Sequence, residues 1–296
     1  MQQFAVLGAG SWGTALALVL ARNGHTVRLW GHDPEMIRQM ARQRHNPRYL
    51  CDVELPVNIT PETDLNKAVN QADAVLVVVP SSVFGSLLEN LAGLLTPGVP
   101  VIWATKGLDA ASGGLLHELA ARKLPGHPLA VLSGPSFAGE VAKGLPTAVA
   151  LAGTDLSATR ALADAFHDAR FRVYLSNDIT GVELGGAVKN VLAIATGMSD
   201  GLGFGANARA GLITRGLAEI RRLGARLGAA DETLTGLAGM GDLILTCTDN
   251  QSRNRQMGIA LGQGESVAAT AARIGQVVEG VRTAKEPAML AARLKI

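Results

Sequence analysis

Residues 4–13 read Phe-Ala-Val-Leu-Gly-Ala-Gly-Ser-Trp-Gly, an apolar run that ends in a Gly-x-Gly-x-x-Gly pattern at Gly8, Gly10 and Gly13. Residues 14–21 continue as an apolar, helix-favouring stretch. This order of strand, glycine turn and helix is typical of the βαβ unit that binds a dinucleotide. In that unit Gly8 permits the tight turn, Gly10 lets the backbone approach a pyrophosphate, and Gly13 lets the helix pack on the strand. The alternative is a glycine turn used for packing alone or for another phosphate ligand.

Strand and helix signals alternate through the first half of the chain. The strand candidates are short, continuous apolar runs bounded by Gly or Pro, which indicates a parallel sheet with helices on both faces. They cover residues 4–7, 26–30, 74–79, 101–104, 130–132, 148–151 and 172–175. The helices expected between them cover residues 11–23, 34–44, 83–95, 113–123 and 157–166.

Strand signals fade near residue 177, and helical periodicity dominates beyond it. The expected helices cover residues 179–198, 206–224, 232–239, 252–262, 266–274 and 283–294. We therefore predict an α/β protein with a Rossmann-type dinucleotide-binding domain and a mostly parallel sheet over residues 1–177. An all-helical C-terminal domain is predicted over residues 178–296.

The composition of the 296 residues narrows the class of protein. The 27 basic and 25 acidic residues leave a net charge of +2, which argues against nucleic acid or a membrane surface as the main partner. The two cysteines, Cys51 and Cys247, lie far apart, and free thiols in a reducing compartment are favoured over a disulfide. We expect no metal site, no signal peptide and no membrane span, and hence a soluble, cytoplasmic protein.

The end of the second predicted strand bears on which dinucleotide binds. NAD-binding units place an acid there for the ribose hydroxyls, whereas NADP-binding units favour a basic residue. This strand is followed by Gly31, His32, Asp33 and Pro34. Asp33 fits better as a helix N-cap, with Pro34 at the first helical position. His32 is then favoured near the adenosine ribose and its 2′-phosphate, over a solvated histidine, so that NADP is preferred without excluding NAD.

Two further strands of the predicted sheet end in small or charged residues. Lys106 follows the fourth strand, where ligands of open α/β sheets bind, so it is a candidate for contact with an anionic substrate or cofactor. A surface lysine near a turn is the alternative. The sequence Ser-Gly-Pro-Ser-Phe-Ala at 133–138 follows another strand, and its small residues would let a ligand come close.

Lys189 is the single cation in the apolar stretch 179–198. A lysine there should have a desolvated amine and a lowered pKa, which suits proton transfer. The alternative is a lysine that reaches solvent from the rim of a core helix. Gly185 and Gly186 weaken this helix, so we expect close approach of a backbone or ligand there, and Asn190 could hydrogen-bond a hydroxyl.

Residues 239–242 and 248–254 are both interpreted as polar turns. The second leads into a helix, and a helix N-terminus with Arg253 beside Ser252 and Asn254 would suit a phosphate group. The alternative is N-capping by Ser252 or Asn254, with Arg253 exposed.

Taken together, the motifs resemble the bacterial-type NAD(P)-dependent glycerol-3-phosphate dehydrogenases. The similarity rests on Gly-Ala-Gly-Ser-Trp-Gly-Thr-Ala at 8–15, Trp-Ala-Thr-Lys-Gly-Leu at 103–108, Leu-Ser-Gly-Pro-Ser-Phe-Ala at 132–138, Leu-Gly-Gly-Ala-Val-Lys-Asn at 184–190, Gly-Phe-Gly-Ala-Asn-Ala-Arg at 203–209, Asp-Asn-Gln-Ser-Arg-Asn-Arg at 249–255 and Gly-Gln-Val-Val-Glu-Gly at 275–280. They span nearly the whole chain in the family's order.

The resemblance implies reversible reduction of dihydroxyacetone phosphate to sn-glycerol 3-phosphate with NADP or NAD, for glycerophospholipid synthesis. It implies that Lys189 transfers the proton and also contacts the substrate. Cofactor contacts are implied for Ser11, Trp12, His32, Lys106, Ala138, Arg253, Val277 and Glu279, besides the glycine turn. Substrate contacts are implied for Lys106, Gly134, Ser136, Asp242, Ser252, Arg253 and Asn254.

The resemblance leaves some points open. Members of the family usually continue for a few dozen residues beyond the equivalent of Ile296, so a less stable helical domain or altered oligomeric contacts are expected, and a homodimer is compatible with the sequence. The alternatives in function are a β-hydroxyacid or 6-phosphogluconate-type dehydrogenase and a non-catalytic NADP-binding regulator. Residues 249–255 favour a phosphorylated triose over the first. Retention of Lys189, Asp242 and Arg253 argues against the second.

Overall fold

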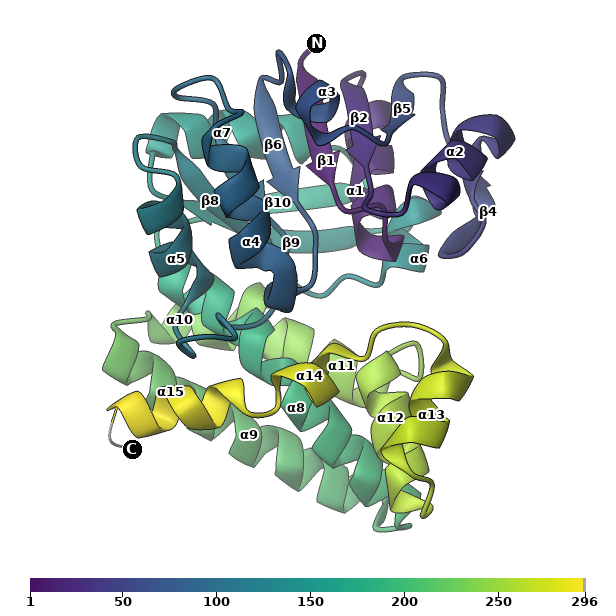
Figure 1. Ribbon diagram of the computed structural model, residues 1–296. Coiled ribbons are helices and arrows are strands. Elements are labelled where there is room, and N and C mark those ends of the chain that lie inside the picture. Colours follow the sequence, from purple (N-terminus) through teal and green to yellow (C-terminus); the bar gives the residue numbers. More distant parts are fainter. Residues whose placement is uncertain (295–296) are drawn as a thin grey trace. The chain divides into compact units, whose positions relative to one another are not determined.

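The computed structural model describes residues 1–294, which form two compact units (Figure 1). The first unit comprises Met1–Thr105, His117–Leu132 and Ser136–Asn177. The second comprises Lys106–Leu116, Ser133–Pro135 and the described chain from Asp178 onward. Two short segments that follow strands of the first unit therefore belong to the second unit.

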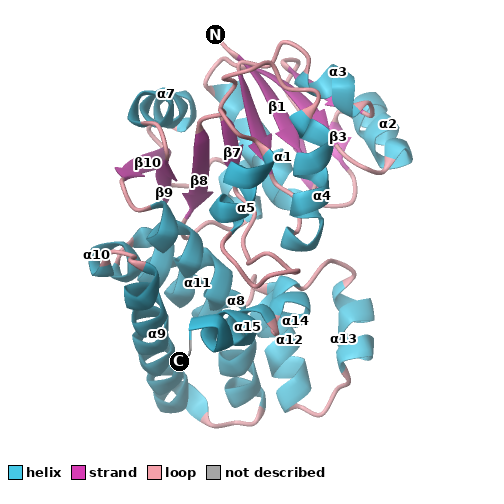
Figure 2. Cartoon of the chain, turned by 60° about the vertical axis from the view of Figure 1, so that its left-hand side comes forward, coloured by secondary structure: helices cyan, strands magenta, loops and turns pink. Residues whose placement is uncertain are grey.

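A mostly parallel sheet forms the first unit, as predicted. Eight of its strands follow the order β10-β9-β8-β7-β6-β1-β2-β5 (Figure 2). The N–H of Thr154, directly after β9, donates to the carbonyl of Leu129 at the start of β8 (2.8 Å), so β9 and β10 run opposite to the other six. The strands are β1 (Gln3–Leu7), β2 (Thr26–Trp30), β5 (Ile59–Glu62), β6 (Ala74–Val77), β7 (Val101–Trp103), β8 (Leu129–Ser133), β9 (Thr147–Gly153) and β10 (Phe171–Ser176).

Helices cover both faces of this sheet because successive side chains of a strand point to opposite sides. Phe4 and Val6 of β1 pack with the apolar residues of α1 (Ser11–Arg22) in one buried cluster. On the other face Trp103 of β7 meets Phe84 of α4 (Ser81–Ala92), with ring centroids 5.9 Å apart. The predicted arrangement of strands buried on both sides is thus confirmed.

Other parts of the first unit match the sequence less well. The helices α2 (Pro34–Gln43), α5 (Leu116–Lys123) and α7 (Leu156–Phe166) correspond to predicted ones. The sequence did not predict β3 (His45–Asn46), β4 (Leu50–Glu54), β5, α3 (Leu65–Val69) and α6 (Ala138–Ala142). The edge strand β5 escaped because it contains Pro61, and proline within a strand is tolerated at a sheet edge.

In the second unit, residues 178–294 are helical apart from their connections (Figure 2). None of the helices within residues 1–294 is both long and apolar enough to cross a membrane. The elements are α8 (Ile179–Gly201), α9 (Gly205–Leu227), α10 (Asp231–Thr235), the π-helical turn η1 (Leu237–Gly241), α11 (Asp242–Thr248), α12 (Arg253–Gly262), α13 (Val267–Ile274), α14 (Glu279–Thr283) and α15 (Glu286–Leu294).

Three predictions for these helices were wrong. The helix expected over residues 232–239 is interrupted at Gly236, between α10 and η1. Residues 283–294 do not form a single helix: α14 ends at Thr283, and α15 begins three residues later with Pro287 in its first turn, where a missing N–H costs nothing. Residues 239–242 are not a polar turn, because they lie in η1 and at the start of α11. The glycines at 239 and 241 suggested a turn, but Gly239 serves close packing instead, since a Cβ there would overlap the carbonyl of Leu234.

The helices α8 and α12 pack backbone to backbone along a seam of glycines. A Cβ on Gly258 of α12 would overlap the carbonyl of Ile194 and lie 2.9 Å from the Cα of Gly197 on α8. A Cβ on Gly197 would in turn overlap the carbonyl of Arg255. The seam therefore fixes α12 against α8, which carries Lys189.

We expect Gly258→Ala to lower the free energy of unfolding by about 1–3 kcal/mol, since the added methyl group must push two backbones apart. Gly211→Ala is the matched control. Gly211 lies exposed in α9 with no atom within 4 Å of the new Cβ. There the helix propensity of alanine should stabilise the protein by up to about 1 kcal/mol. Denaturant unfolding of both variants checks this, and equal stability of the two would show that the seam is loose.

Candidate active site

The glycine turn lies between β1 and α1, at the point where the strand order of the sheet reverses. Gly8 has φ of 125°, a conformation that disfavours any side chain. The carbonyl of Gly8 occupies the place where Gly13 would carry a Cβ, so α1 packs directly on the turn. Beside Gly10 no atom lies within 4 Å of a Cβ position, and Trp12 Nε1 is a buried donor without a partner among residues 1–294. The turn thus fits a dinucleotide, whose ligand crevice lies at such a reversal.

The end of β2 matches the reasoning about Asp33. Its carboxylate accepts hydrogen bonds from the N–H groups of Glu35 (3.1 Å) and Met36 (3.2 Å), so it caps α2 as predicted. A Cβ on Gly31 would lie 2.7 Å from Cδ1 of Ile37, so an acidic side chain there would have to displace Ile37. His32 is exposed beside these residues.

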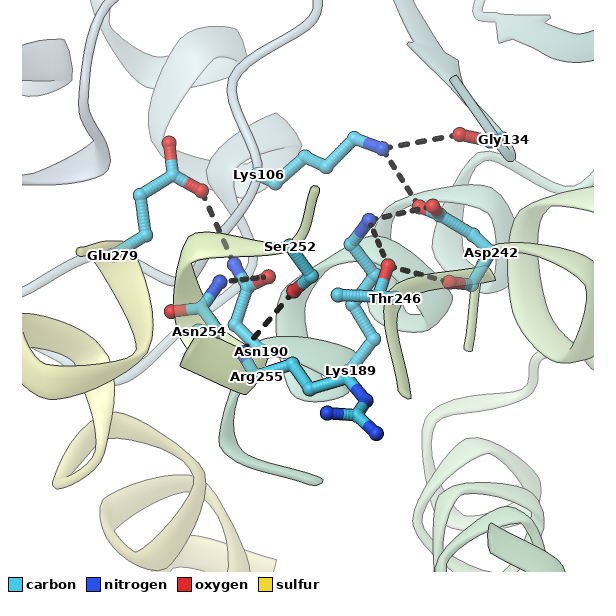
Figure 3. Close-up of polar contacts among 10 residues, drawn as sticks. All are labelled: Lys106, Gly134, Lys189, Asn190, Asp242, Thr246, Ser252, Asn254, Arg255 and Glu279. Carbon is cyan, nitrogen blue, oxygen red and sulfur yellow. Dashed lines mark hydrogen bonds and ion pairs between the residues drawn. The ribbon is translucent and has the colours of Figure 1, made fainter. Parts of the chain in front are cut away.

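In the second unit, Lys189 lies in the middle of α8 and does not reach solvent, since 7% of the residue is exposed. Its Nζ donates to Oδ1 of Asp242 (2.5 Å) and to Oγ1 of Thr246 (2.9 Å) (Figure 3). The glycines before it permit close packing, as expected: a Cβ on Gly185 would overlap the carbonyl of Ala238, and one on Gly186 would lie 2.7 Å from Ser133 Oγ.

Asp242 joins two lysines. Its Oδ2 lies 2.6 Å from Nζ of Lys106, which also donates to the carbonyl of Gly134 (3.2 Å) (Figure 3). Asp242 is fully buried, and its position at the start of α11 places Thr246 one helical turn away. A carboxylate between two ammonium groups leaves one net positive charge in a buried cluster, which would attract and polarise an electron-rich oxygen.

The pKa of Lys189 is lowered to about 8 from its usual 10.5. Burial is the main cause, because it disfavours the charged amine, and the neighbouring Lys106 adds to it. The charge of Asp242 opposes both effects. The amine can therefore exist in either protonation state near neutral pH, as a group that exchanges a proton must.

A second polar group surrounds the N-terminus of α12. Ser252 is its N-cap, accepting from the N–H of Arg255 (3.2 Å), while Arg253 donates to Oε1 of Gln276 (3.2 Å). The capping alternative thus holds for Ser252, although Arg253 is half-buried instead of exposed. Asn254 donates to Oδ1 of Asn190 (2.9 Å) and accepts from the N–H of Gly280 (2.8 Å).

Asn190 links this group to α14, because its amide donates to Oε2 of Glu279 (3.1 Å) (Figure 3). The adjacent residues Lys189 and Asn190 of α8 therefore join two different polar clusters. Sequence reasoning gave Asn190 to a ligand hydroxyl and did not foresee these side-chain partners. Thr246 was not predicted as a site residue. In a helix over residues 242–248 it lies four residues after Asp242 and so on the same face, but that helix was not predicted.

The expected site residues fall into both units. Those in the first unit are Gly8, Gly10, Ser11, Trp12, Gly13, His32, Ser136 and Ala138. Those in the second are Lys106, Gly134, Lys189, Asp242, Ser252, Arg253, Asn254, Val277 and Glu279. The structure brings Lys106, Gly134, Lys189 and Asp242 together in one hydrogen-bonded cluster, and Asn254 and Glu279 together through Asn190. Among residues 1–294, no group of three or more His, Cys, Asp or Glu is placed to hold a metal ion.

A glycine turn at the reversal of a parallel sheet, with a buried lysine of lowered pKa, defines the class of nicotinamide-dependent oxidoreductases. Residues 3–159 match the family model for the NAD-dependent glycerol-3-phosphate dehydrogenase N-terminus, and residues 178–296 match that for its C-terminus. The chain therefore belongs to the NAD-dependent glycerol-3-phosphate dehydrogenase family, as the sequence motifs indicated.

Individual relatives agree with this assignment. The chain is 61% identical over 282 residues to the glycerol-3-phosphate dehydrogenase [NAD(P)+] of Alkalilimnicola ehrlichii, covering 95% of this chain and 85% of that protein. The corresponding protein of Thioalkalivibrio sulfidiphilus is 57% identical over 293 residues, covering 99% and 88%. The crystal structure of glycerol-3-phosphate dehydrogenase from Coxiella burnetii superposes with a TM-score of 0.97 at 48% identity, covering 100% of this chain and 90% of that one.

Proposed function

We propose that the chain is an oxidoreductase that reversibly reduces dihydroxyacetone phosphate to sn-glycerol 3-phosphate with NADPH or NADH. The observation that carries this proposal is the buried cluster of Lys189, Asp242 and Lys106 in a member of this family. We further propose that the reaction takes place in the cytoplasm and supplies the backbone of glycerophospholipids.

We also propose that residues 1–177 form the dinucleotide-binding domain and residues 178–296 the helical domain that binds substrate and carries the acid. Support for the first comes from the glycine turn, and for the second from the location of Lys189. Residues 106–116 and 133–135 pack with the helical unit, and they bring Lys106 and Gly134 to Asp242. In function, these two segments then belong with the substrate domain.

The proposed chemistry uses Lys189 as general acid and base. When bound, the nicotinamide cofactor supplies the hydride that reduces the ketone carbon, and negative charge develops on the carbonyl oxygen. Lys189 in its ammonium form stabilises that charge and donates the proton, and in the reverse direction its neutral amine accepts the proton from the hydroxyl. Asp242 and Thr246 hold the amine in place by the hydrogen bonds described above.

The other ligand contacts are proposed on the resemblance and on position. We propose that Ser252, Arg253 and Asn254 hold the substrate phosphate, where the N-terminus of α12 adds favourable N–H dipoles. Gly134 and Ser136 would complete the substrate contacts. The cofactor contacts would come from the glycine turn with Ser11, Trp12, His32, Lys106, Ala138, Arg253, Val277 and Glu279. The exposed His32 and the capping role of Asp33 favour NADPH over NADH.

The test is to follow the absorbance of the reduced nicotinamide with purified protein and dihydroxyacetone phosphate, with NADPH and NADH in parallel. Oxidation that depends on the triose phosphate supports the proposal, and the ratio of the two rates gives the cofactor preference. Absence of oxidation with either cofactor, in protein shown to be folded, would reject it. If NADPH or NADH is oxidised only when the keto acid precursor of a β-hydroxyacid is supplied, the substrate class is that of the β-hydroxyacid dehydrogenases instead.

The pKa of Lys189 predicts opposite pH profiles for the two directions. Reduction needs the ammonium form, so its kcat should fall as the pH rises through about 8, whereas oxidation needs the neutral amine and should accelerate over the same range. Of the groups around Lys189, the buried thiol of Cys247 does not interfere, since burial raises its pKa to about 11. Rate profiles in both directions between about pH 7 and 9 check this. Two profiles with the same slope would contradict the assignment.

A further inference from the structure

Arg255 is a buried guanidinium that the proposed chemistry leaves unused. It is the third residue of α12, and 6% of it is exposed. Its NH2 lies 2.5 Å from Oδ2 of Asp200, near the end of α8, and its Nε donates to the carbonyl of Cys247 in α11 (3.1 Å). One side chain thus connects three helices, of which α8 carries Lys189 and α11 carries Asp242.

The contacts of Arg255 lie at both ends of the connection between α11 and α12. Residues 249–252 link α11 to α12. At the start of this connection the guanidinium holds the carbonyl of Cys247, and at its end the N–H of Arg255 is held by Ser252 Oγ (3.2 Å). The backbone of Arg255 is itself fixed, because its carbonyl lies against Gly197 in the glycine seam. Arg255 therefore anchors both ends of the connection to α8.

Stability alone accounts poorly for this arrangement. The NH1 of Arg255 is buried without a hydrogen-bond partner among residues 1–294, and an unsatisfied buried donor costs free energy. A buried ion pair is in general a weak source of stability compared with well-packed apolar side chains. Figure 3 shows the guanidinium directed away from the side chains of Ser252 and Asn254, so it would act through them and not by touching a ligand.

We propose that Arg255 is a positioning residue, which holds residues 252–254 in the geometry that binds the substrate phosphate. This inference rests on the proposed function, since that assigns Ser252, Arg253 and Asn254 to the phosphate. Loss of the guanidinium frees the start of α12 from α11. Lys189 keeps its hydrogen bonds to Asp242 and Thr246. Substrate affinity should then suffer more than cofactor affinity, because residues 252–254 hold the substrate phosphate whereas the cofactor has only Arg253 among them.

Arg209 offers a matched control. It lies in α9 and donates to the same Oδ2 of Asp200 (2.9 Å), with 29% of its side chain exposed. Arg209→Met removes the same charge and a bond to the same carboxylate, but it leaves the hydrogen bond to Cys247 in place. A merely structural contribution of the ion-pair cluster would affect Arg209→Met and Arg255→Met alike.

The experiment compares Arg255→Met, Arg255→Lys and Arg209→Met with the unmodified chain. In Arg255→Met we expect KM for dihydroxyacetone phosphate to rise about tenfold or more, because small misplacements of binding groups are costly. The rise in KM for NADPH should be several times smaller, since Arg253 is one of many proposed cofactor contacts, and kcat should change less than about threefold. Arg255→Lys should recover part of the loss, since an ammonium can reach Asp200 but cannot also hold the Cys247 carbonyl. Arg209→Met should keep every constant near its original value.

Calorimetric titration with sn-glycerol 3-phosphate, and with inorganic phosphate, gives a readout that needs no turnover. Weaker binding in Arg255→Met than in Arg209→Met supports the positioning role of Arg255. Failure of the unmodified chain to oxidise NADPH would reject the proposed function, but it would leave this comparison of binding valid. Equal dissociation constants and equal KM values in the folded variants would overturn the positioning role. If Arg255→Met does not fold, the comparison of Arg255→Lys with Arg209→Met decides by the same criteria.

Discussion

Replacing Lys189 by alanine is expected to lower kcat for reduction of dihydroxyacetone phosphate by about 10³- to 10⁴-fold. This loss combines the proton donor with the charge that stabilises the developing oxyanion. The dissociation constant for NADPH should change less than about threefold, because the proposed cofactor contacts lie on other residues. The fold should survive, since Asp242 keeps its ion pair with Lys106 at 2.6 Å. Steady-state kinetics and a fluorescence titration with NADPH measure the two effects.

Two companion variants sharpen this experiment. Lys189→Arg retains a cation but removes a group that loses its proton near neutral pH, so it should remain severely impaired in both directions. Lys285→Ala removes an exposed lysine of the same unit and should leave the kinetics unchanged. Turnover in Lys189→Ala within tenfold of the original would exclude Lys189 as the acid, and Lys106 would then be the next candidate.

The sequence predicted well where a local pattern decides the structure. The glycine turn predicted β1, α1 and the close packing of Gly13 on Gly8, because each depends on residues next to one another in the chain. The isolated cation at 189 in an apolar helix indicated either a buried amine of lowered pKa or a lysine that reaches solvent, and the structure shows the first. The packing of the turn follows from glycines that lack a side chain, and the burial of Lys189 follows from the apolar residues around it. A single sequence shows both features directly.

The remainder depends on contacts between distant parts of the chain. The segment 239–242 was predicted to be a turn, because its sequence gives no sign that the backbone of Leu234 occupies the side-chain position of Gly239. Because α11 was not predicted, the contacts of Asp242 with Thr246 and with the two lysines could not be predicted either. Lys106 joins the helical unit although it directly follows the sheet. Such pairings arise from tertiary packing, which overrides local preference.

Asp242→Ala is expected to have the largest effect on stability, lowering the free energy of unfolding by about 3–5 kcal/mol. Removal of one partner leaves buried charge uncompensated, and here it leaves two ammonium groups, of Lys189 and Lys106, without their shared carboxylate. Activity should fall at least about 10³-fold as well. The charge of Asp242 raises the pKa of Lys189, so its loss lowers that pKa further and reduces the fraction of the amine that can donate a proton.

A double variant separates the two consequences of losing Asp242. In Asp242→Ala combined with Lys106→Met, one of the two uncompensated cations disappears, so the unfolding free energy should recover by at least about 1 kcal/mol relative to Asp242→Ala alone. Catalysis should not recover, because Lys189 still lacks the carboxylate that holds it protonated and in place. Denaturant unfolding and steady-state rates of four proteins test this cycle: the original chain, Asp242→Ala, Lys106→Met and the double variant. Additive losses of stability would mean that the carboxylate does not balance both lysines, and its 2.6 Å contact with Lys106 would then contribute little to the buried site.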